Sequence, residues 1–301
     1  MFTALPEPAR IEIDYAALFG IRSIAAASIF AGLYAPLCVW FIWSAVKNSN
    51  GGSYVYGVLG FFCLIRLVAF IIRALLAGMP SLGENLALFT ADEVLFGVGF
   101  FALLYSAYTL VLDREIISGT PQSSSLLSQL VRHRRLFRIA LLLGVILGII
   151  GIQDILNGSP KVGRNLREAS TIIFLVLTVL QTCLALKLVL ASDSKPEELE
   201  LAGEAGLTAD KTPSKPAVGD RYAMYLILLI SLCLLVRQSF LTATLNNASE
   251  EGDERLWFPL VAAPEYLAVL CYSAPGLVPS KKAIEDASSA QRSTDNTFIS
   301  V

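Results

Sequence analysis

The stretch FFCLIRLVAFIIRALL, residues 61–76, points most directly to the fold class of this chain. Apart from Arg66 and Arg73 it is entirely apolar, and it lies within a longer apolar run over residues 54–78. At about 1.5 Å per residue, an α-helix of this length crosses a hydrocarbon core of about 30 Å. Because a backbone in lipid must satisfy its own polar groups, the run predicts a transmembrane helix.

The same composition extends through the 301-residue chain. Hydrophobic residues make up 55% of it and charged residues 16%, whereas soluble domains carry about 25% charged residues. Six more apolar runs of similar length accompany the first. The sequence therefore predicts an all-α, seven-transmembrane-helix bundle within residues 23–278, with spans at residues 23–46, 54–78, 88–112, 136–156, 169–190, 222–245 and 256–278.

The distribution of Lys and Arg predicts the orientation of this bundle. Cytoplasmic segments hold an excess of positive charge, and the first, third and fifth connections with the tail carry about twice as many Lys and Arg residues as the other face. We expect residues 1–22 on the extracellular or lumenal side and the C-terminus in the cytoplasm. A glycosylation sequon at Asn247 falls on the predicted outer side, in agreement with this orientation.

Two polar segments and one basic run belong to the predicted cytoplasmic face. Residues 192–220 and 279–301 are rich in charged and small residues, so we expect a flexible loop and a disordered tail. Between the third and fourth spans, Arg132, Arg134 and Arg135 form a basic run beside the membrane. Such a run typically binds anionic lipid, and the alternative is a docking site for a cytoplasmic partner.

Three charged residues fall well inside the predicted spans. Counted from the outer helix ends, Arg66 lies about 18 Å deep, Glu265 about 14 Å and Arg237 about 12 Å, so they can share one layer. A charge at helix mid-depth costs roughly 2.5–3.5 kcal/mol on insertion scales and usually pairs inside the bundle. We expect Glu265 to bridge both arginines if the second, sixth and seventh helices are neighbours. One surplus positive charge then remains in the layer.

Arg73, Asp92 and Glu93 form a second predicted group, nearer the outer surface and between the second and third helices. Both groups have two interpretations. They are salt bridges that fix the register of the helices, or the surplus positive charge of the deep layer binds an anionic lipid or small molecule. Arg66, Arg237 and Glu265, together with the second group, are therefore the candidate ligand-binding residues.

The sequence argues against several other classes of site. All five cysteines lie inside apolar runs, and His133 is the one histidine, so no metal cluster is expected. The chain contains no G-x-S-x-G, no H-E-x-x-H and no phosphate-binding glycine loop. A net charge of −2 gives no general attraction to nucleic acid. We expect no cofactor, no metal and no nucleic-acid partner.

Four stretches resemble a fungal family of uncharacterised seven-helix membrane proteins: residues 61–76, LREASTIIFLVLTVLQ at 166–181, LLVRQSFLTATL at 234–245 and PEYLAVLCYSAPGLVP at 264–279. The resemblance runs through nearly all of the predicted membrane part, with fixed points at Arg66, Arg237 and Glu265. It implies the seven-helix class and a distant architectural similarity to lipid-translocating exporters and receptor-shaped proteins. It implies no particular activity.

Three kinds of function stay open. A receptor-like or scaffold protein would sense a ligand among the helices; the triplet Asp113-Arg114-Glu115 is loosely similar to the DRY motif of rhodopsin-like receptors, although no NPxxY follows. A carrier or lipid translocator would hold an anionic headgroup at the deep layer. An intramembrane, terpene-cyclase-like enzyme would use Glu265, or Asp92 and Glu93, as a proton donor and would need that carboxyl protonated, whereas an arginine neighbour favours the ionised form of Glu265. We therefore favour binding, sensing or transport over catalysis, in the plasma membrane or an endomembrane.

Overall fold

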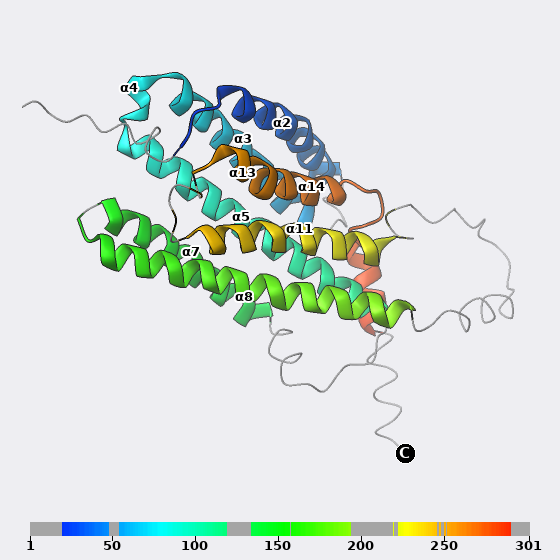
Figure 1. Ribbon diagram of the computed structural model, residues 1–301. Coiled ribbons are helices and arrows are strands. Elements are labelled where there is room, and N and C mark those ends of the chain that lie inside the picture. The colour runs from blue at the N-terminus through cyan, green and yellow to red at the C-terminus, as the bar shows by residue number, and fades with distance from the viewer. Residues whose placement is uncertain are drawn as a thin grey trace, which may run out of the picture.

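All regular elements in the described part of the chain are helices, and Figure 1 shows the long ones packed side by side. The computed structural model describes residues 20–47, 54–118, 134–156, 158–193, 219, 222–245, 247, 250 and 252–289. In chain order the elements are α2 (Ile24–Lys47), α3 (Val55–Gly78), α4 (Pro80–Gly83), α5 (Leu86–Ile117), α7 (Arg134–Leu156), α8 (Pro160–Asp193), α11 (Ala223–Thr244), α13 (Glu254–Trp257), η1 (Phe258–Ala262) and α14 (Ala263–Tyr272). For these residues the predicted all-α class is confirmed.

Six of these helices are long and apolar enough to cross a membrane: α2, α3, α5, α7, α8 and α11. They expose large apolar side chains, among them Ile29, Phe61 and Val176, each at least half exposed. Apolar surface of this extent is unusual on a protein surrounded by water and suits contact with lipid. The bundle therefore fits a multi-pass integral membrane protein.

Two of the six helices extend well beyond the predicted spans, by more than a turn. α5 continues to Ile117 instead of ending at residue 112, and α8 begins at Pro160 instead of residue 169. Proline suits the first helical position, because the N–H that it lacks would have no helical partner there. Hydropathy marks only the apolar part of a helix, so these polar helical turns fall outside the prediction.

The segment predicted as the seventh span, residues 256–278, is helical over residues 254–272 and changes type on the way. It begins as α13, passes through the π-helical turn η1 and ends as α14. A π turn holds one extra residue within an α-helix. The helix ends earlier than predicted because Pro275 and Gly276 follow it, Gly276 with a φ of 88°.

Successive long helices run in alternating directions. One end of the bundle therefore holds α4, the α7–α8 connection at Gly158 and the start of α13, and we call it the α4 end (Figure 1). α5 packs against α3, α7, α8 and α11, and of the six long helices it has the largest share of buried residues. Polar side chains on α5 therefore face other helices rather than lipid.

Residues 20–23 lie beside α13 at the α4 end and form what we call the strap. Glu254 Oε1 accepts hydrogen bonds from the backbone N–H groups of Arg22 at 2.8 Å and Ser23 at 2.9 Å. A carboxylate in this position satisfies N–H groups at the start of α2, which have no helical partner of their own. The strap thereby joins the start of α2 to the start of α13.

Several predicted features lie outside the described residues, namely residues 1–19, Arg132, residues 194–218 of the predicted loop and residues 290–301 of the predicted tail. The predicted loop begins later than expected, since residues 192–193 still belong to α8. The predicted tail also needs a correction, because residues 281–289 form a helix. Ser280 Oγ accepts a hydrogen bond from the Ala283 N–H at 3.2 Å, which is the usual N-cap contact of such a helix.

Candidate functional site

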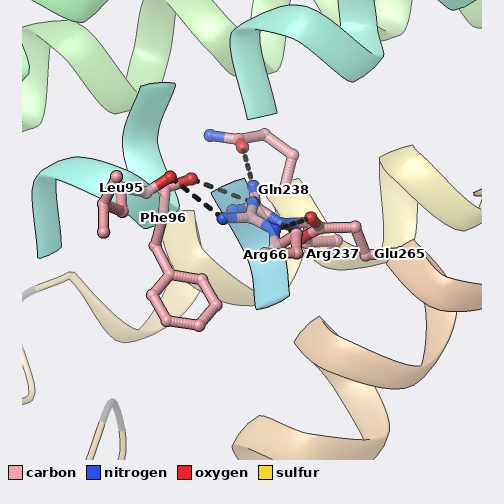
Figure 2. Close-up of polar contacts among 6 residues, drawn as sticks. All are labelled: Arg66, Leu95, Phe96, Arg237, Gln238 and Glu265. Atoms are coloured by element: carbon pink, nitrogen blue, oxygen red, sulfur yellow. Dashed lines mark hydrogen bonds and ion pairs between the residues drawn. The ribbon is translucent and has the colours of Figure 1, made fainter. Parts of the chain in front are cut away.

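Three buried charged side chains meet inside the bundle, and we call them the Arg–Glu–Arg cluster: Arg66 of α3, Glu265 of α14 and Arg237 of α11. One Glu265 carboxylate oxygen accepts a hydrogen bond from Arg66 Nε, and the other accepts one from Arg237 Nε at 2.8 Å. The three side chains are between 0% and 5% exposed. Figure 2 shows the two guanidinium groups converging on the carboxylate. The predicted bridge between three separate helices is confirmed.

Arg66 is anchored on α5 as well as on Glu265. Its Nη1 and Nη2 atoms donate hydrogen bonds to the backbone carbonyls of Leu95 at 3.1 Å and Phe96 at 3.0 Å (Figure 2). Gly99, on the next turn of α5, leaves space for this guanidinium group, because a Cβ there would lie 2.8 Å from Arg66 Nη1. Arg66 is therefore bound on both sides, by a carboxylate and by a helix backbone.

Arg237 has fewer protein partners. Besides the Glu265 contact, its Nη1 donates to Gln238 Oε1 at a long 3.4 Å, and its Cζ lies 3.9 Å from the ring centroid of Phe100. In the described part of the chain its Nη2 donates to no protein group. Two guanidinium groups share one carboxylate, so one positive charge is in surplus. Since each nitrogen of Arg66 already donates to a protein acceptor, and Arg66 does not line the cavity, the group able to bind something else is Arg237.

Arg73, Asp92 and Glu93 meet between the Arg–Glu–Arg cluster and the α4 end, and we call them the Arg73 cluster. Arg73 Nε and Nη2 each lie 3.2 Å from Asp92 Oδ2, and Nη2 lies 3.8 Å from Glu93 Oε1. Arg167 of α8 approaches the other Glu93 oxygen at 3.9 Å. The predicted grouping is confirmed. Glu93 holds its two arginines loosely, because both distances exceed hydrogen-bond length.

Aromatic rings separate and cover the two clusters. The Phe96 ring lies between two arginines, with its centroid 4.6 Å from Arg66 Cζ and 4.5 Å from Arg73 Cζ. Trp257 lies beside Phe96, and its ring centroid is 4.0 Å from Arg73 Cζ. A cation over an aromatic face gains about 2 kcal/mol when both are removed from water. The rings also exclude water from the ion pairs, which strengthens the interactions between charges.

A cavity of ≈ 170 Å³ lies between the Arg–Glu–Arg cluster and the α4 end. Arg237 and Phe100 line it, and the strap lines it together with Gly252 and Glu254. Its remaining wall includes Arg73 and Arg167, several aromatic rings and aliphatic side chains of α11. The cavity thus combines positive charge with apolar surface.

The structure divides the six predicted binding residues into two sets. Arg73, Glu93 and Arg237 line the cavity, whereas Arg66, Asp92 and Glu265 lie behind the lining and hold it in place. Arg167 lines the cavity although its position in a polar segment of the sequence marked it only as part of a connection. Glycines and aromatic rings of the site carried no distinct signal in the sequence either, because apolar runs contain many of both.

The Asp113-Arg114-Glu115 triplet lies at the end of the bundle opposite the α4 end. Arg114 donates from Nε and Nη2 to the Leu277 carbonyl at 3.2 and 2.8 Å, and Asp113 Oδ1 accepts a hydrogen bond from Arg134 Nη2 at 2.7 Å. These contacts fix α5 to the segment after α14 and to α7. Arg134 of the basic run is therefore engaged within the protein, while Arg135 is exposed.

No protein-family model, no curated protein and no solved structure matches this chain. Within the described ranges, no group of three or more His, Cys, Asp or Glu side chains could hold a metal ion. The chemistry available at the site is therefore that of arginine, carboxylate and aromatic side chains around a small cavity.

Proposed function

We propose that this chain is a seven-span integral membrane protein that binds an anionic group, a phosphate or a carboxylate, in the cavity beside Arg237. The observation that carries the proposal is the surplus guanidinium group of Arg237, which lines the cavity and has donors without a protein partner. Guanidinium groups bind phosphate and carboxylate through paired N–H donors. In a site of low dielectric such a contact is stronger than in water.

The proposal of a seventh span rests on residues 254–272, a helical segment of about 28 Å at 1.5 Å per residue. It packs against α11 and provides Glu265 to the buried cluster. The α4 end faces the extracellular or lumenal side in this proposal, as the distribution of Lys and Arg predicts. Asn247 is exposed at that end.

The proposed orientation predicts that Asn247 is glycosylated when the chain is expressed in a secretory host. The measurement is the mobility shift on glycosidase treatment, with Asn247→Gln as the unglycosylated reference. A second acceptor sequon placed within residues 194–218 should stay unmodified, since the proposal puts that segment in the cytoplasm. Modification of the inserted sequon in place of Asn247 would reverse the orientation.

Two other functions receive less support. An enzyme that used Glu265 as a proton donor would need a free carboxyl oxygen, but both oxygens accept hydrogen bonds from arginines. A pure scaffold would use the clusters only to fix helix register, which accounts for Arg66 and Asp92 but leaves the donors of Arg237 in the cavity without a role. Binding of an anionic group gives the donors of Arg237 a role as well, with Arg66 and Asp92 holding the site in place.

Replacing Arg237 by glutamine should abolish binding and keep the fold. The variant leaves Arg66 and Glu265 as a neutral pair, so the buried charge balance improves as the anion site is lost. Native mass spectrometry of protein purified in neutral detergent should find an anionic species on the wild type and at least about tenfold less of it on the variant, a difference of about 1.4 kcal/mol.

Arg164→Gln is the matched control, because it removes an exposed arginine of α8 that does not line the cavity. It should retain the anionic species at the wild-type level. The proposal fails if Arg237→Gln retains as much as the wild type. It also fails if the wild type retains no anion and is stabilised neither by inorganic phosphate nor by dodecyl phosphate.

A further inference from the structure

We propose that the ligand of this cavity is an amphiphile, an alkyl chain with a phosphate or carboxylate headgroup, and that it enters from the side between α5 and α7. The inference rests on the proposed function, because it assumes that Arg237 binds the anionic group. Three observations support it: the size of the cavity, the closure of its α4 end, and the exposed Gly97 beside a part of the α5–α7 interface without polar or ring contacts.

The cavity is the size of a headgroup. Its volume of ≈ 170 Å³ is close to that of an engineered cavity of about 150 Å³ that binds benzene. Sites for whole drug-sized molecules measure about 300–1,000 Å³. A phosphate or carboxylate with the first atoms of a chain fits this space, whereas a complete lipid does not. The rest of an amphiphile must therefore lie outside the cavity.

The strap covers the cavity towards the α4 end. Gly20 and Gly252 touch there so closely that a Cβ on Gly20 would lie 2.1 Å from the Gly252 carbonyl oxygen, and Gly20 has a φ of 75°. The close approach and the positive φ both require glycine at position 20. Glu254 adds the two hydrogen bonds to the backbone of Arg22 and Ser23. A direct route from the aqueous phase into the cavity therefore meets closely packed backbone.

At the level of the cavity, the described residues of α5 and α7 are not joined by polar or ring contacts. Among the described residues, the polar and ring contacts that join these two helices lie in the other half of the bundle: Tyr105–Arg138, Tyr108–Phe137 and Asp113–Arg134. Gly97 of α5 lines the cavity and is exposed, and a Cβ there would meet no atom within 4 Å.

The surroundings of this opening suit an alkyl chain. On α7, Ile152 lines the cavity, and Val145 and Ile149 are partly exposed apolar residues on the same face of the helix. A chain that leaves the cavity past Gly97 would therefore lie along apolar side chains at the lipid-facing surface. Its headgroup would remain beside Arg237, and the bilayer itself would supply the ligand.

The test compares two probes on the full-length protein in neutral detergent, dodecyl phosphate and inorganic phosphate. Binding is measured by native mass spectrometry and by the increase in melting temperature. Dodecyl phosphate should bind the wild type with a Kd at least about tenfold below that of inorganic phosphate, because its chain concentrates it in the apolar phase. Gly97→Trp should block the opening and abolish binding of dodecyl phosphate.

Gly32→Trp is the matched control. Gly32 lies on α2, far from the cavity lining, and a Cβ there also meets no atom within 4 Å. This variant should bind dodecyl phosphate like the wild type. If Gly97→Trp does not fold, Gly97→Leu places a smaller side chain in the same opening and replaces it in the comparison.

The outcomes separate the entry route from the proposed function. If inorganic phosphate binds as well as dodecyl phosphate, and Gly97→Trp affects neither while Arg237→Gln abolishes both, the anion site stands and lateral entry of an amphiphile is wrong. If both probes bind Arg237→Gln as they bind the wild type, the proposed function itself is wrong. Loss of dodecyl phosphate binding in Gly97→Trp and in Arg237→Gln, with Gly32→Trp unaffected, supports both.

Discussion

Replacing Glu265 by glutamine is expected to lower the free energy of unfolding by about 3–5 kcal/mol, which is the usual cost of removing one member of a buried ion pair. The carboxylate is the one negative charge between two guanidinium groups, and its side chain is 2% exposed. Without it, Arg66 and Arg237 repel each other in a region that water does not reach. The measurement is the melting temperature in neutral detergent, compared with the wild type.

Two further variants separate this effect from a general loss of charge. Glu285→Gln removes an exposed carboxylate and should leave the melting temperature unchanged. Adding Arg237→Gln to Glu265→Gln removes one of the two unpaired guanidinium groups, and part of the lost stability should return. An unchanged melting temperature in Glu265→Gln would mean that the cluster does not hold the helices together.

Replacing Gly99 by alanine is expected to lower the free energy of unfolding by about 1–3 kcal/mol, as overpacking of a filled interior does. The added methyl group would lie 2.8 Å from Arg66 Nη1 and 2.9 Å from Arg66 Cζ. A flexible side chain could move aside, but hydrogen bonds to Glu265 and to the carbonyls of Leu95 and Phe96 hold this one in place.

Gly97→Ala provides the comparison for this variant, two residues earlier on the same helix. Both changes bring the same gain in helix propensity, about 1 kcal/mol, and only Gly99→Ala creates a close contact. Gly97→Ala should therefore melt at or above the wild-type temperature, and Gly99→Ala below it. Equal melting temperatures for the two variants would show that Arg66 is free to move.

The buried clusters were predictable because a charged side chain within a membrane helix usually faces the bundle interior and pairs there with an opposite charge. A membrane helix that contains Arg66 must turn it inward and find an acceptor, and Glu265 was the carboxylate at matching depth. The same reasoning joined Arg73 to Asp92 and Glu93. Depth along a helix follows from simple counting at about 1.5 Å per residue, so the pairing could be derived without knowing how the helices pack.

Other parts of the site depend on packing and could not be derived in this way. Gly99 is one of many glycines in apolar runs, and its importance follows only from its position opposite Arg66. Arg167 belongs to a polar stretch of sequence, and it reaches Glu93 because α8 begins well before its apolar part. The strap is held by Glu254, whose partners lie more than 200 residues away in the chain.

The π-helical turn η1 determines which residues of the last helix face α3. On α3, Arg66 and Arg73 are seven residues apart, which is two turns of an α-helix and places them on one face. Their partners Glu265 and Trp257 are eight residues apart, and the extra residue of the π turn brings both of them to the same face.

The π geometry of this segment is therefore part of the site. If the same residues formed a regular α-helix throughout, Glu265 would point about 100° around the helix axis from the direction that faces Arg66. Such a helix would retain each charged residue and lose the bridge between them. A substitution that removes the π turn would therefore break the bridge without changing any charge.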